Sequence, residues 1–478
     1  MALLDTLPRH LFTQRGWGML AAGAAALAAA QVMGRRDLLS LAVLLFVLPL
    51  ISLAGIRLVK PRFQVYREFN PSPVETSAPT TVRLAVARTG AASGRATMEE
   101  RLPPRFGESP AFRFPSRSAN GGTSRYEYHL RSAQRGQFLI GPVTAEFTDP
   151  FGLSLHRQAI DDGDTLTVTP AAVVLPLTGL AGARGNDGVT ATRIRANPSD
   201  DDVMTREYRH GDPMRRVHWA ATARHGSLMV RQEESVTTPE ATIILDHRFT
   251  AFSGGSGTVP AGSAAQDGHA MISSETFEWA VVAAMSISAH LAERNYALRL
   301  LDARGEPAFL HSPSAPEPEV EEYSGASGLQ SIAESLAAIQ LTGPHARRDS
   351  GLRDIVGPRE SHGHQDTGPP PFEDNLMDKL SAHRMRGPLI AVLGRISPLD
   401  ALSLAPAAGY GTNAFAIVIT ERPAEFEDAL EKLRQGGWRA AAVPPSVSVA
   451  AAWNQFDQDV ALPGTPATEV RRGAEVAG

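Results

Sequence analysis

The sequence predicts a multi-domain membrane protein with a two-helix transmembrane hairpin, a β-sandwich and a doubly wound α/β domain. Three observations lead to this fold class. Two uncharged apolar runs stand near the start of the chain, short alternating segments follow them, and strand-like and helix-like segments then alternate. The predicted boundaries are 1–60 for the hairpin, 61–190 for the β-sandwich, 191–235 for a distinctive central segment, 236–460 for the α/β domain and 461–478 for a disordered tail.

The composition is that of folded globular material, and it narrows the possible functions. The chain has 478 residues, enough for about two or three domains of ~100–200 residues each. Its net charge is −5, so the chain lacks the strong positive charge that would attract a nucleic acid. There is no cysteine, which excludes disulfides, thiolate metal sites and cysteine nucleophiles.

The two uncharged runs, residues 16–34 and 38–56, have the length of membrane spans. Each has 19 residues, which form a helix of roughly 28 Å and match a hydrocarbon core of about 30 Å. Only Arg35-Arg36-Asp37 separates them. We therefore expect helices at about 16–34 and 38–57 to return as a hairpin in a lipid bilayer.

The charges around the hairpin predict on which side of the plasma membrane the chain ends lie. Six cations flank the hairpin against two in its loop, and the six are Arg9, Arg15, Arg57, Lys60, Arg62 and Arg67. This excess favours a cytoplasmic location for both ends and for the soluble domains. An alternative is a signal peptide cleaved after Ala28-Ala29-Ala30, which would leave the second helix as an anchor with the rest outside.

Residues 62–175 carry the signal of β-strands. Segments such as FQVYREF, TTVRLAVARTG, SRYEYHLRS and TLTVTP alternate apolar and polar residues between Gly, Pro and Ser turns. Short strands at this spacing predict a β-sandwich. The stretch TDPFGL at 148–153 predicts a tight turn in which Pro150 presets φ and Gly152 adopts a positive φ.

After residue 240 the pattern changes to alternating strands and helices. The predicted strands are 241–246, 296–302, 389–394, 415–420 and 438–443, and the predicted helices are 276–295, 329–341 and 425–437. Such alternation predicts a largely parallel, doubly wound sheet. Residues 251–273 and 342–371 are rich in Gly, Ser, Pro or charge and are predicted to be loops.

The stretch REYRHGDPMRRVHWAATARHG, residues 206–226, is the densest in charge and aromatic surface. It predicts a strand at 203–209, a turn at Gly211 and a helix over 213–225 that Gly226 ends. Asp212 is expected to cap this helix, with Pro213 at its first position. The Arg215 guanidinium would then lie against the Trp219 indole, four residues further on.

Three functions are open for this segment on chemical grounds. The first is catalysis by Asp212, His218 and Ser227, although no nucleophile elbow surrounds Ser227. The second is an anion site at Arg215 and Arg216 near a helix N-terminus, which the negative Asp212 would oppose. The third is a clasp that joins the β-domain to the α/β domain or docks a protein partner, for which Trp and Arg are suitable anchors.

The same stretch resembles the signature of the DUF58 family, R-x-Y-x-x-G-D-x-x-R-x-I-x-W-x-x-(S/T)-A-R followed by a strand and acidic residues. The matching residues are Arg206, Tyr208, Gly211, Asp212, Arg215, Val217, His218, Trp219, Thr222, Ala223 and Arg224, with Val in place of Ile. The upstream stretch RGQFLIGPVTAEFTDPFGL at 135–153 is similar to a second family motif. The order of parts, from hairpin to α/β domain, also resembles that of the family.

The resemblance implies a bacterial membrane protein with a von Willebrand factor type A-like domain. It further implies association with a MoxR-type AAA+ ATPase and a transglutaminase-like membrane protein, but it does not imply any general catalytic activity. Metal-binding type A domains carry D-x-S-x-S after their first strand, where this chain has Asp246 to Thr250. Asp246 and Thr250 are therefore only a degenerate metal candidate, because Arg248 puts positive charge at a ligand position.

Taken together, these patterns predict a membrane-anchored, non-catalytic protein-interaction scaffold without a cofactor. The predicted interaction residues are Arg206, Tyr208, Gly211, Asp212, Arg215, Arg216, His218, Trp219 and Arg224. Two alternatives stay open. One is an envelope-associated hydrolase or transferase that uses the Asp212 and His218 region, and the other is an anion- or polyanion-binding module.

Overall fold

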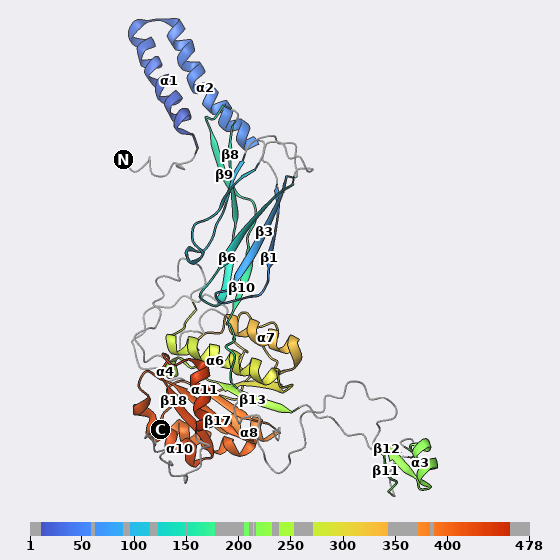
Figure 1. The fold of residues 1–478 in the computed structure, drawn as a ribbon. Helices are drawn as coiled ribbons and strands as arrows, with labels where there is room; N and C mark the ends of the chain where they lie inside the picture. Colours follow the sequence, from blue (N-terminus) through green and yellow to red (C-terminus); the bar gives the residue numbers. More distant parts are fainter. Residues whose placement is uncertain are drawn as a thin grey trace, which may run out of the picture.

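The structure, a computed structural model, has three parts in a row and a fourth, small part at the side (Figure 1). A helical hairpin comes first, a β-domain follows it, and an α/β domain lies at the other end. The residues that the structure describes are 11–58, 63–88, 96–114, 123–149, 151–176, 205–209, 214, 217–231, 239–252, 271–342, 371–382 and 387–458.

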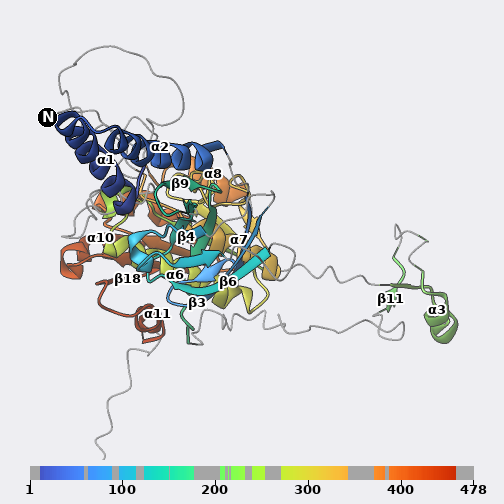
Figure 2. The same ribbon diagram turned by 90° about the horizontal axis from the view of Figure 1, so that it is seen from above.

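The hairpin consists of α1 (Gln14–Met33) and α2 (Arg36–Leu58), which run side by side (Figures 1 and 2). Thr13 caps α1 by accepting a hydrogen bond from the Gly16 N–H, and Gly34 ends the helix at φ 65°. The connection is shorter than predicted, because Arg36 already begins α2. By length and composition, both helices are long and apolar enough to cross a membrane.

The β-domain contains strands β1 to β10 in three sheets, ordered β1-β3-β6, β2-β10-β7 and β5-β4-β8-β9. Within the sheets the pairing is antiparallel, except that β2 runs parallel to β10. The bounds are β1 Phe63–Asn70, β2 Val74–Glu75, β3 Pro79–Arg88, β4 Ala96–Glu100, β5 Ala111–Phe114, β6 Thr123–Arg131, β7 Gly136–Ile140, β8 Val143–Thr148, β9 Leu155–Ala159 and β10 Asp164–Thr169.

One face of β3 holds the β-domain together. Val82 packs into a core with residues of β7 and β10, whereas Leu84 and Val86 pack into a second core with residues of β4, β5 and β8. These three side chains lie two residues apart, as expected for one face of a strand. The β1-β3-β6 sheet therefore covers both other sheets, and the three sheets form two layers.

The charge pattern places Arg67 among the cations that flank the hairpin, but the structure does not. Its side chain is fully buried in β1, and its guanidinium pairs with the carboxylates of Glu100, Asp161 and Asp164. The prediction was wrong because an arginine near a helix in sequence can be drawn into a protein interior by carboxylates far along the chain. The prediction that the chain ends lie in the cytoplasm thus rests on five flanking cations against the two arginines of the loop.

The α/β domain has one sheet in the order β15-β14-β13-β16-β17-β18, in which β15 alone is antiparallel to its neighbour. The strands are β13 Glu240–Leu245, β14 Ala297–Asp302, β15 Glu322–Tyr323, β16 Leu389–Leu393, β17 Ala414–Ile419 and β18 Trp438–Val443. The helices are α4 Phe249–Phe252, α6 Glu275–Ala292, α7 Gly325–Ala337, α8 Asp374–Ala382, α9 Pro398–Leu404, α10 Glu427–Gln435 and α11 Val449–Gln458.

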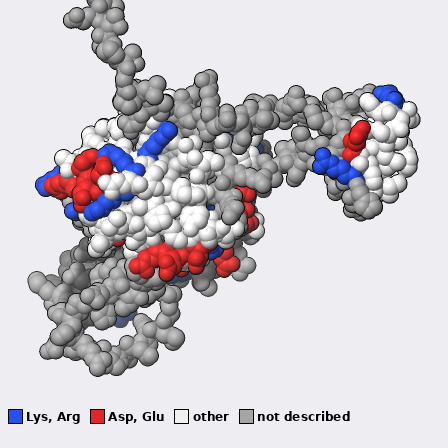
Figure 3. Space-filling model, turned by 90° about the horizontal axis from the view of Figure 1, so that it is seen from below, with Lys and Arg blue, Asp and Glu red and all other residues white. Residues whose placement is uncertain are grey.

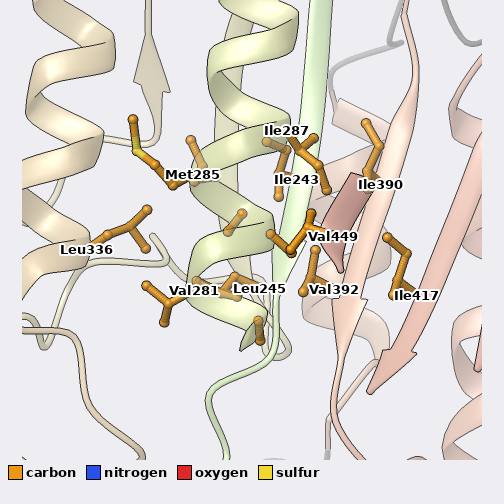
Figure 4. Packing of buried hydrophobic residues seen from close by; sticks show 14 of the residues in the cluster. Ile243, Leu245, Val281, Met285, Ile287, Leu336, Ile390, Val392, Ile417 and Val449 are labelled. Carbon is orange, nitrogen blue, oxygen red and sulfur yellow. The ribbon is translucent and has the colours of Figure 1, made fainter. Parts of the chain in front are cut away.

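Helices cover both faces of this sheet, as the predicted doubly wound fold requires. Apolar residues of α6, α7 and α11 pack on one face, where Figure 4 shows Val281, Leu336 and Val449 around strand residues such as Ile243. Apolar residues of α8, α9 and α10 pack on the other face. The strands are buried on both sides, which explains their continuous apolar runs in the sequence.

Two loop boundaries differ from the prediction. Ala251 and Phe252, the first residues of the predicted 251–273 loop, lie in α4 and are buried in the core beside Phe277. Thr342, the first residue of the predicted 342–371 loop, donates its N–H to the His247 carbonyl and is paired with Arg248. Both predictions were wrong at these ends because composition alone does not show where tertiary contacts begin.

The β-domain and the α/β domain meet at Arg135, which lies just before β7 and is 2% exposed. Its Nε and Nη2 bind both carboxylate oxygens of Glu278 in α6, at 2.8 and 2.9 Å. Its Nη1 donates to the carbonyls of Leu336, Ala337 and Ile339 at the end of α7. Arg135 thus occupies the place of a clasp, with its cation at the negative end of a helix dipole.

The described residues of the 206–226 segment take no part in the Arg135 contact. Its described residues form a separate unit of β11 (Thr205–Glu207), α3 (Trp219–His225) and β12 (Met229–Arg231). Figures 1 and 2 show this unit, which we call the signature unit, away from both domains. Residues 210–213, 215 and 216 of the segment lie outside the described residues, so the predicted clasp stays a prediction.

His290 is a buried histidine that is expected to make the stability of the α/β domain sensitive to acid. It is buried in α6 against the Trp453 ring, and its Nε2 has no hydrogen-bond partner among the residues described. Burial, together with the nearby Arg294 cation, lowers the pKa of His290 to about 4. The unfolded chain takes up a proton at about pH 6.5, so the free energy of unfolding falls as pH falls from about 6.5 to 4.

We expect His290 to account for a loss of up to about 3 kcal/mol between pH 7 and pH 4. Urea denaturation at both pH values gives the loss in free energy of unfolding for wild type and for His290→Leu. The difference between the two losses is the contribution of His290. His225→Leu, at an exposed position of α3, is the matched control and should behave as wild type. Equal acid sensitivity of wild type and His290→Leu would contradict the prediction.

Candidate functional site

The signature unit is a two-stranded antiparallel sheet with one short helix. β11 pairs with β12, and Tyr208 continues the pairing by donating its N–H to the Leu228 carbonyl at 2.8 Å. Val217, Met229 and Val230 are its buried apolar side chains among the residues described. Gly226 ends α3 at φ 73°, as predicted, because the left-handed region suits glycine.

Of the predicted helix over 213–225, Trp219–His225 form α3, whereas Val217 and His218 are not helical. Val217 forms a bridge with Val230, and the His218 N–H donates to the Met229 carbonyl at 2.8 Å. The chain at 217–218 therefore adds to the sheet, which suits a β-branched residue better than a helix does. The helix cap is His218, whose Nδ1 accepts a hydrogen bond from the Ala221 N–H at 3.1 Å, so Asp212 is not the cap of α3.

The structure describes only some of the predicted interaction residues. Arg206 lies in β11, Tyr208 is half-buried, and Trp219 and Arg224 are exposed on α3. Gly211, Asp212, Arg215 and Arg216 lie outside the described residues, as does Pro213. The predicted contact of Arg215 with Trp219 and the predicted anion site at Arg215 and Arg216 therefore fall outside them too.

The groups suggested for catalysis have local structural roles. His218 uses Nδ1 to cap α3, and the Ser227 hydroxyl donates to the Met229 sulfur at 3.9 Å. A serine nucleophile needs its hydroxyl within hydrogen-bonding reach of a base, at about 2.6–3.2 Å. The geometry of these two side chains instead stabilises the turn between α3 and β12.

The signature unit exposes three large apolar side chains among its described residues. Trp219 is 65% exposed and Met214 is 56% exposed, and Leu228 is the third large apolar side chain at its surface. Most of the described surface of the unit is uncharged in Figure 3, with charged atoms at its margins. Exposed tryptophan at this level is typical of a surface that another molecule covers.

A second candidate is the carboxyl edge of the α/β sheet, where β13 and β16 lie side by side. Ligands of open α/β sheets bind where the chain leaves two adjacent strands toward opposite faces. Here α6 follows β13 on one face and α9 follows β16 on the other. Asp246 stands at this point, directly after β13, and is fully buried.

Arg248 occupies this edge. Its Nε and Nη2 bind the two carboxylate oxygens of Asp246 at 2.9 and 2.8 Å, and its Nη1 lies 3.7 Å from Asp400 at the start of α9. Burial lowers the pKa of Arg248, but the negative charges of Asp246 and Asp400 outweigh it and raise the pKa overall. A guanidinium cation thus neutralises the carboxylate that a metal ion would need.

The other candidate ligand, Thr250, is exposed in α4. The backbone is also tightly packed at this edge, because a Cβ at Gly394 would lie 2.5 Å from the Ala251 carbonyl oxygen. Among the residues described, no group of three His, Asp or Glu side chains is placed to hold a metal ion. The donor set at this edge fits an internal ion pair better than a hydrated cation.

A small cavity of about 30 Å³ lies beside Arg248, at the end of β14. His247, Asp302 and His311 are among its lining residues. His247 is 7% exposed, and its Nδ1 has no hydrogen-bond partner among the residues described. Burial lowers the pKa of His247 and raises the pKa of Asp302, so this cavity favours neutral groups. Its volume suits one water molecule.

Two of the solved structures that are similar to this chain align with about a quarter of it. The PKD domain of an M14-like peptidase from a Thermoplasmatales archaeon aligns with 12% identity and a TM-score of 0.14, over 23% of this chain and 98% of that one. The superoxide reductase (neelaredoxin) from Ignicoccus hospitalis aligns with 13% identity and a TM-score of 0.14, over 24% of this chain and 86% of that one.

No curated protein matches the chain. The model of one protein family matches residues 204–260, and that family is described as "Protein of unknown function DUF58". The matched residues begin just before β11 and end beyond α4, so they include the signature unit, β13 and the Asp246–Arg248 pair. This match supports the resemblance of residues 204–260 to the DUF58 family.

Proposed function

We propose that the protein is a membrane-anchored, non-catalytic scaffold whose signature unit binds a protein partner. The observation that carries the proposal is the exposure of Trp219, with Met214 and Leu228, on the unit that bears the family signature. An exposed tryptophan is an efficient anchor, because its large apolar ring gains from burial and its N–H group can donate a hydrogen bond to the partner. Such anchors contribute most of the binding energy at many interfaces.

The size of the signature unit supports the same conclusion. Val217, Met229 and Val230 are its buried apolar side chains among the residues described. A two-stranded sheet with so small a core is at best marginally stable in water. A partner that covers Trp219 would extend this core, so the unit gains order as well as affinity on binding.

The proposed partner is a MoxR-type AAA+ ATPase, and a transglutaminase-like membrane protein is proposed as a further member of the assembly. Both come from the resemblance to the DUF58 family. The strand order β15-β14-β13-β16-β17-β18 with an antiparallel edge strand supports a von Willebrand factor type A-like assignment for the α/β domain. The Arg248–Asp246 ion pair supports binding without a metal ion in that domain.

The proposed location is the plasma membrane, with the soluble domains in the cytoplasm. The hairpin of α1 and α2 supports an anchor. Arg9, Arg15, Arg57, Lys60 and Arg62 flank it, against Arg35 and Arg36 in its loop. This balance favours cytoplasmic ends.

Binding of the purified ATPase to the full chain in lipid nanodiscs tests the proposal. Replacement of Trp219 with alanine should weaken the affinity by roughly 30-fold, about 2 kcal/mol, because a central aromatic anchor is lost. Leu399→Ala is the matched control, since Leu399 is 75% exposed on the α/β domain and lies outside the unit. Equal affinities of wild type and Trp219→Ala would overturn the proposed role of the unit.

A further inference from the structure

The turn between β8 and β9 is fastened to the base of the helical hairpin. Thr13, directly before α1, donates its N–H to the Leu153 carbonyl at 3.0 Å and its hydroxyl to the Gly152 carbonyl at 2.5 Å. In the other helix, the hydroxyl of Ser52 lies 2.9 Å from that of Ser154, and both residues are buried. Figure 1 shows the ends of β8 and β9 beside the hairpin.

The contact between turn and hairpin is as close as two backbones allow. A Cβ placed on Gly16 would lie 2.1 Å from the Leu153 carbonyl oxygen, so only glycine fits there. Gly16 is also the first residue of the uncharged run at 16–34. The turn at 149–154 therefore lies at the level where α1 becomes apolar, which is the edge of the membrane span.

The turn is held in one shape by Asp149. Its carboxylate accepts hydrogen bonds from the backbone N–H groups of Phe151, Leu153 and Ser154 at 3.0, 2.6 and 2.7 Å. Burial raises the pKa of Asp149, but the Ser52 hydroxyl and these N–H groups outweigh it and lower the pKa overall. The φ of Gly152 is 68°, as predicted, whereas Pro150 lies outside the described residues.

This ordered turn directs one large apolar side chain outward. Phe151 is 65% exposed, although the neighbouring Leu153 is 4% exposed. Trp17 stands next to Gly16 in α1, is 50% exposed and packs edge-to-face against Phe12. Two exposed aromatic residues thus belong to the same end of the hairpin, where aromatic side chains favour the boundary between lipid and water.

We infer that the turn at 149–154 is a membrane-contacting loop, and that Phe151 inserts beside Trp17 into the interface of the bilayer. The inference rests on the proposed membrane anchoring of the hairpin. Lipid is the partner that this position selects, because the turn is bound to the base of both helices. The loop then gives the β-domain a second attachment to the membrane, besides the chain that follows α2, and sets the tilt of the domain.

The absence of cysteine makes a direct test possible, since one introduced cysteine is unique in the full chain. Phe151→Cys is spin-labelled in nanodiscs that contain anionic lipid. The accessibility of the label to oxygen, which concentrates in lipid, is compared with its accessibility to a water-soluble nickel chelate. Val174→Cys is the matched control on the soluble part, where Val174 is 90% exposed, and Leu44→Cys in α2 reports on the hairpin itself.

The expected result is that oxygen reaches the Phe151 label several-fold more readily, relative to the nickel chelate, than it reaches the Val174 label. The Leu44 label should give the highest ratio. A Phe151 label that matches the Val174 label, while the Leu44 label lies in lipid, would overturn the inference alone. A Leu44 label that also reports water would overturn the membrane anchoring on which the inference rests.

Discussion

Replacement of Arg67 with alanine should lower the free energy of unfolding of the β-domain by about 3–5 kcal/mol. The Arg67 side chain is fully buried and binds Glu100, Asp161 and Asp164 at 2.5, 2.8 and 2.6 Å. Glu100 is fully buried as well. Loss of the Arg67 guanidinium leaves the Glu100 carboxylate in the interior without a counter-charge. Removing one partner of a buried ion pair lowers the free energy of unfolding strongly.

The same cluster supplies a more conservative variant. Burial raises the pKa of Glu100, and the Arg67 charge and the Tyr128 hydroxyl oppose this shift. Glu100→Gln removes the charge and keeps an acceptor, so it should cost less than Arg67→Ala. Arg157→Ala is the matched control, because the Arg157–Glu99 pair is about half exposed and such pairs contribute about 0–1 kcal/mol.

Hydrogen exchange of peptides from β1 and β4 in the full chain measures these differences, because exchange reports the free energy of opening of each region. Arg67→Ala should accelerate exchange there by a factor of roughly a hundred or more, as about 3 kcal/mol requires. An Arg67→Ala protein that exchanges as slowly as Arg157→Ala would show that the cluster does not stabilise the sandwich.

Replacement of Arg135 with alanine should separate the β-domain from the α/β domain. Arg135 binds Glu278 through two nitrogens and donates to three carbonyls at the end of α7. The alanine variant leaves three buried carbonyls without this donor, and each such loss costs about 1–3 kcal/mol. Glu278 adds less to the cost, because its side chain is 42% exposed to water and keeps the Ser273 hydroxyl as a donor. Each domain keeps its own core, so the junction should open while both domains stay folded.

Distances between two spin labels measure this opening, again because the chain has no native cysteine. Labels at Tyr66 in β1 and Leu399 in α9 are both exposed, at 66% and 75%. Wild type should give one narrow distance distribution, and Arg135→Ala a broad one. Arg157→Ala serves as the control and should keep the narrow distribution, whereas a narrow distribution for Arg135→Ala would refute the role of Arg135 at the junction.

The junction and the carboxyl edge of the α/β sheet are parts of one continuous stretch. Arg135 binds the carbonyls at 336–339, and three residues later Thr342 donates its N–H to the His247 carbonyl. The neighbouring residue Arg248 pairs with Asp246. The segment from Leu336 to Thr342 therefore contacts the β-domain at one end and the neighbours of the Arg248 ion pair at the other end.

Local patterns in the sequence predicted the central strands and the longest helices of the two large domains, but they missed α8, α9, α11 and the short edge strand β15. The apolar runs became α1 and α2, and the alternating segments became strands such as β1 and β3. The continuous apolar runs became the central strands β13, β16 and β17. These features depend on neighbours within a few residues, so periodicity and turn residues reveal them.

The candidate site was predicted less well than the fold. The signature residues were found from their pattern, and the charge at Arg248 was recognised as an obstacle to a metal ion. The predicted helix included Val217 and His218, but both residues pair with β12 instead. The exposure of Trp219 could not be predicted, because a helix pattern alone does not show which face remains uncovered.

The sequence by itself determined the order of the parts, the two apolar helices, the strands and the family signature, since each depends on residues close together in the chain. Only the tertiary structure decided which partners the buried arginines bind. Arg67 meets Asp164 97 positions further on, and Arg135 meets Leu336 201 positions further on. Such pairs form because an arginine that leaves water needs acceptors wherever the fold brings them, and no local pattern records that choice.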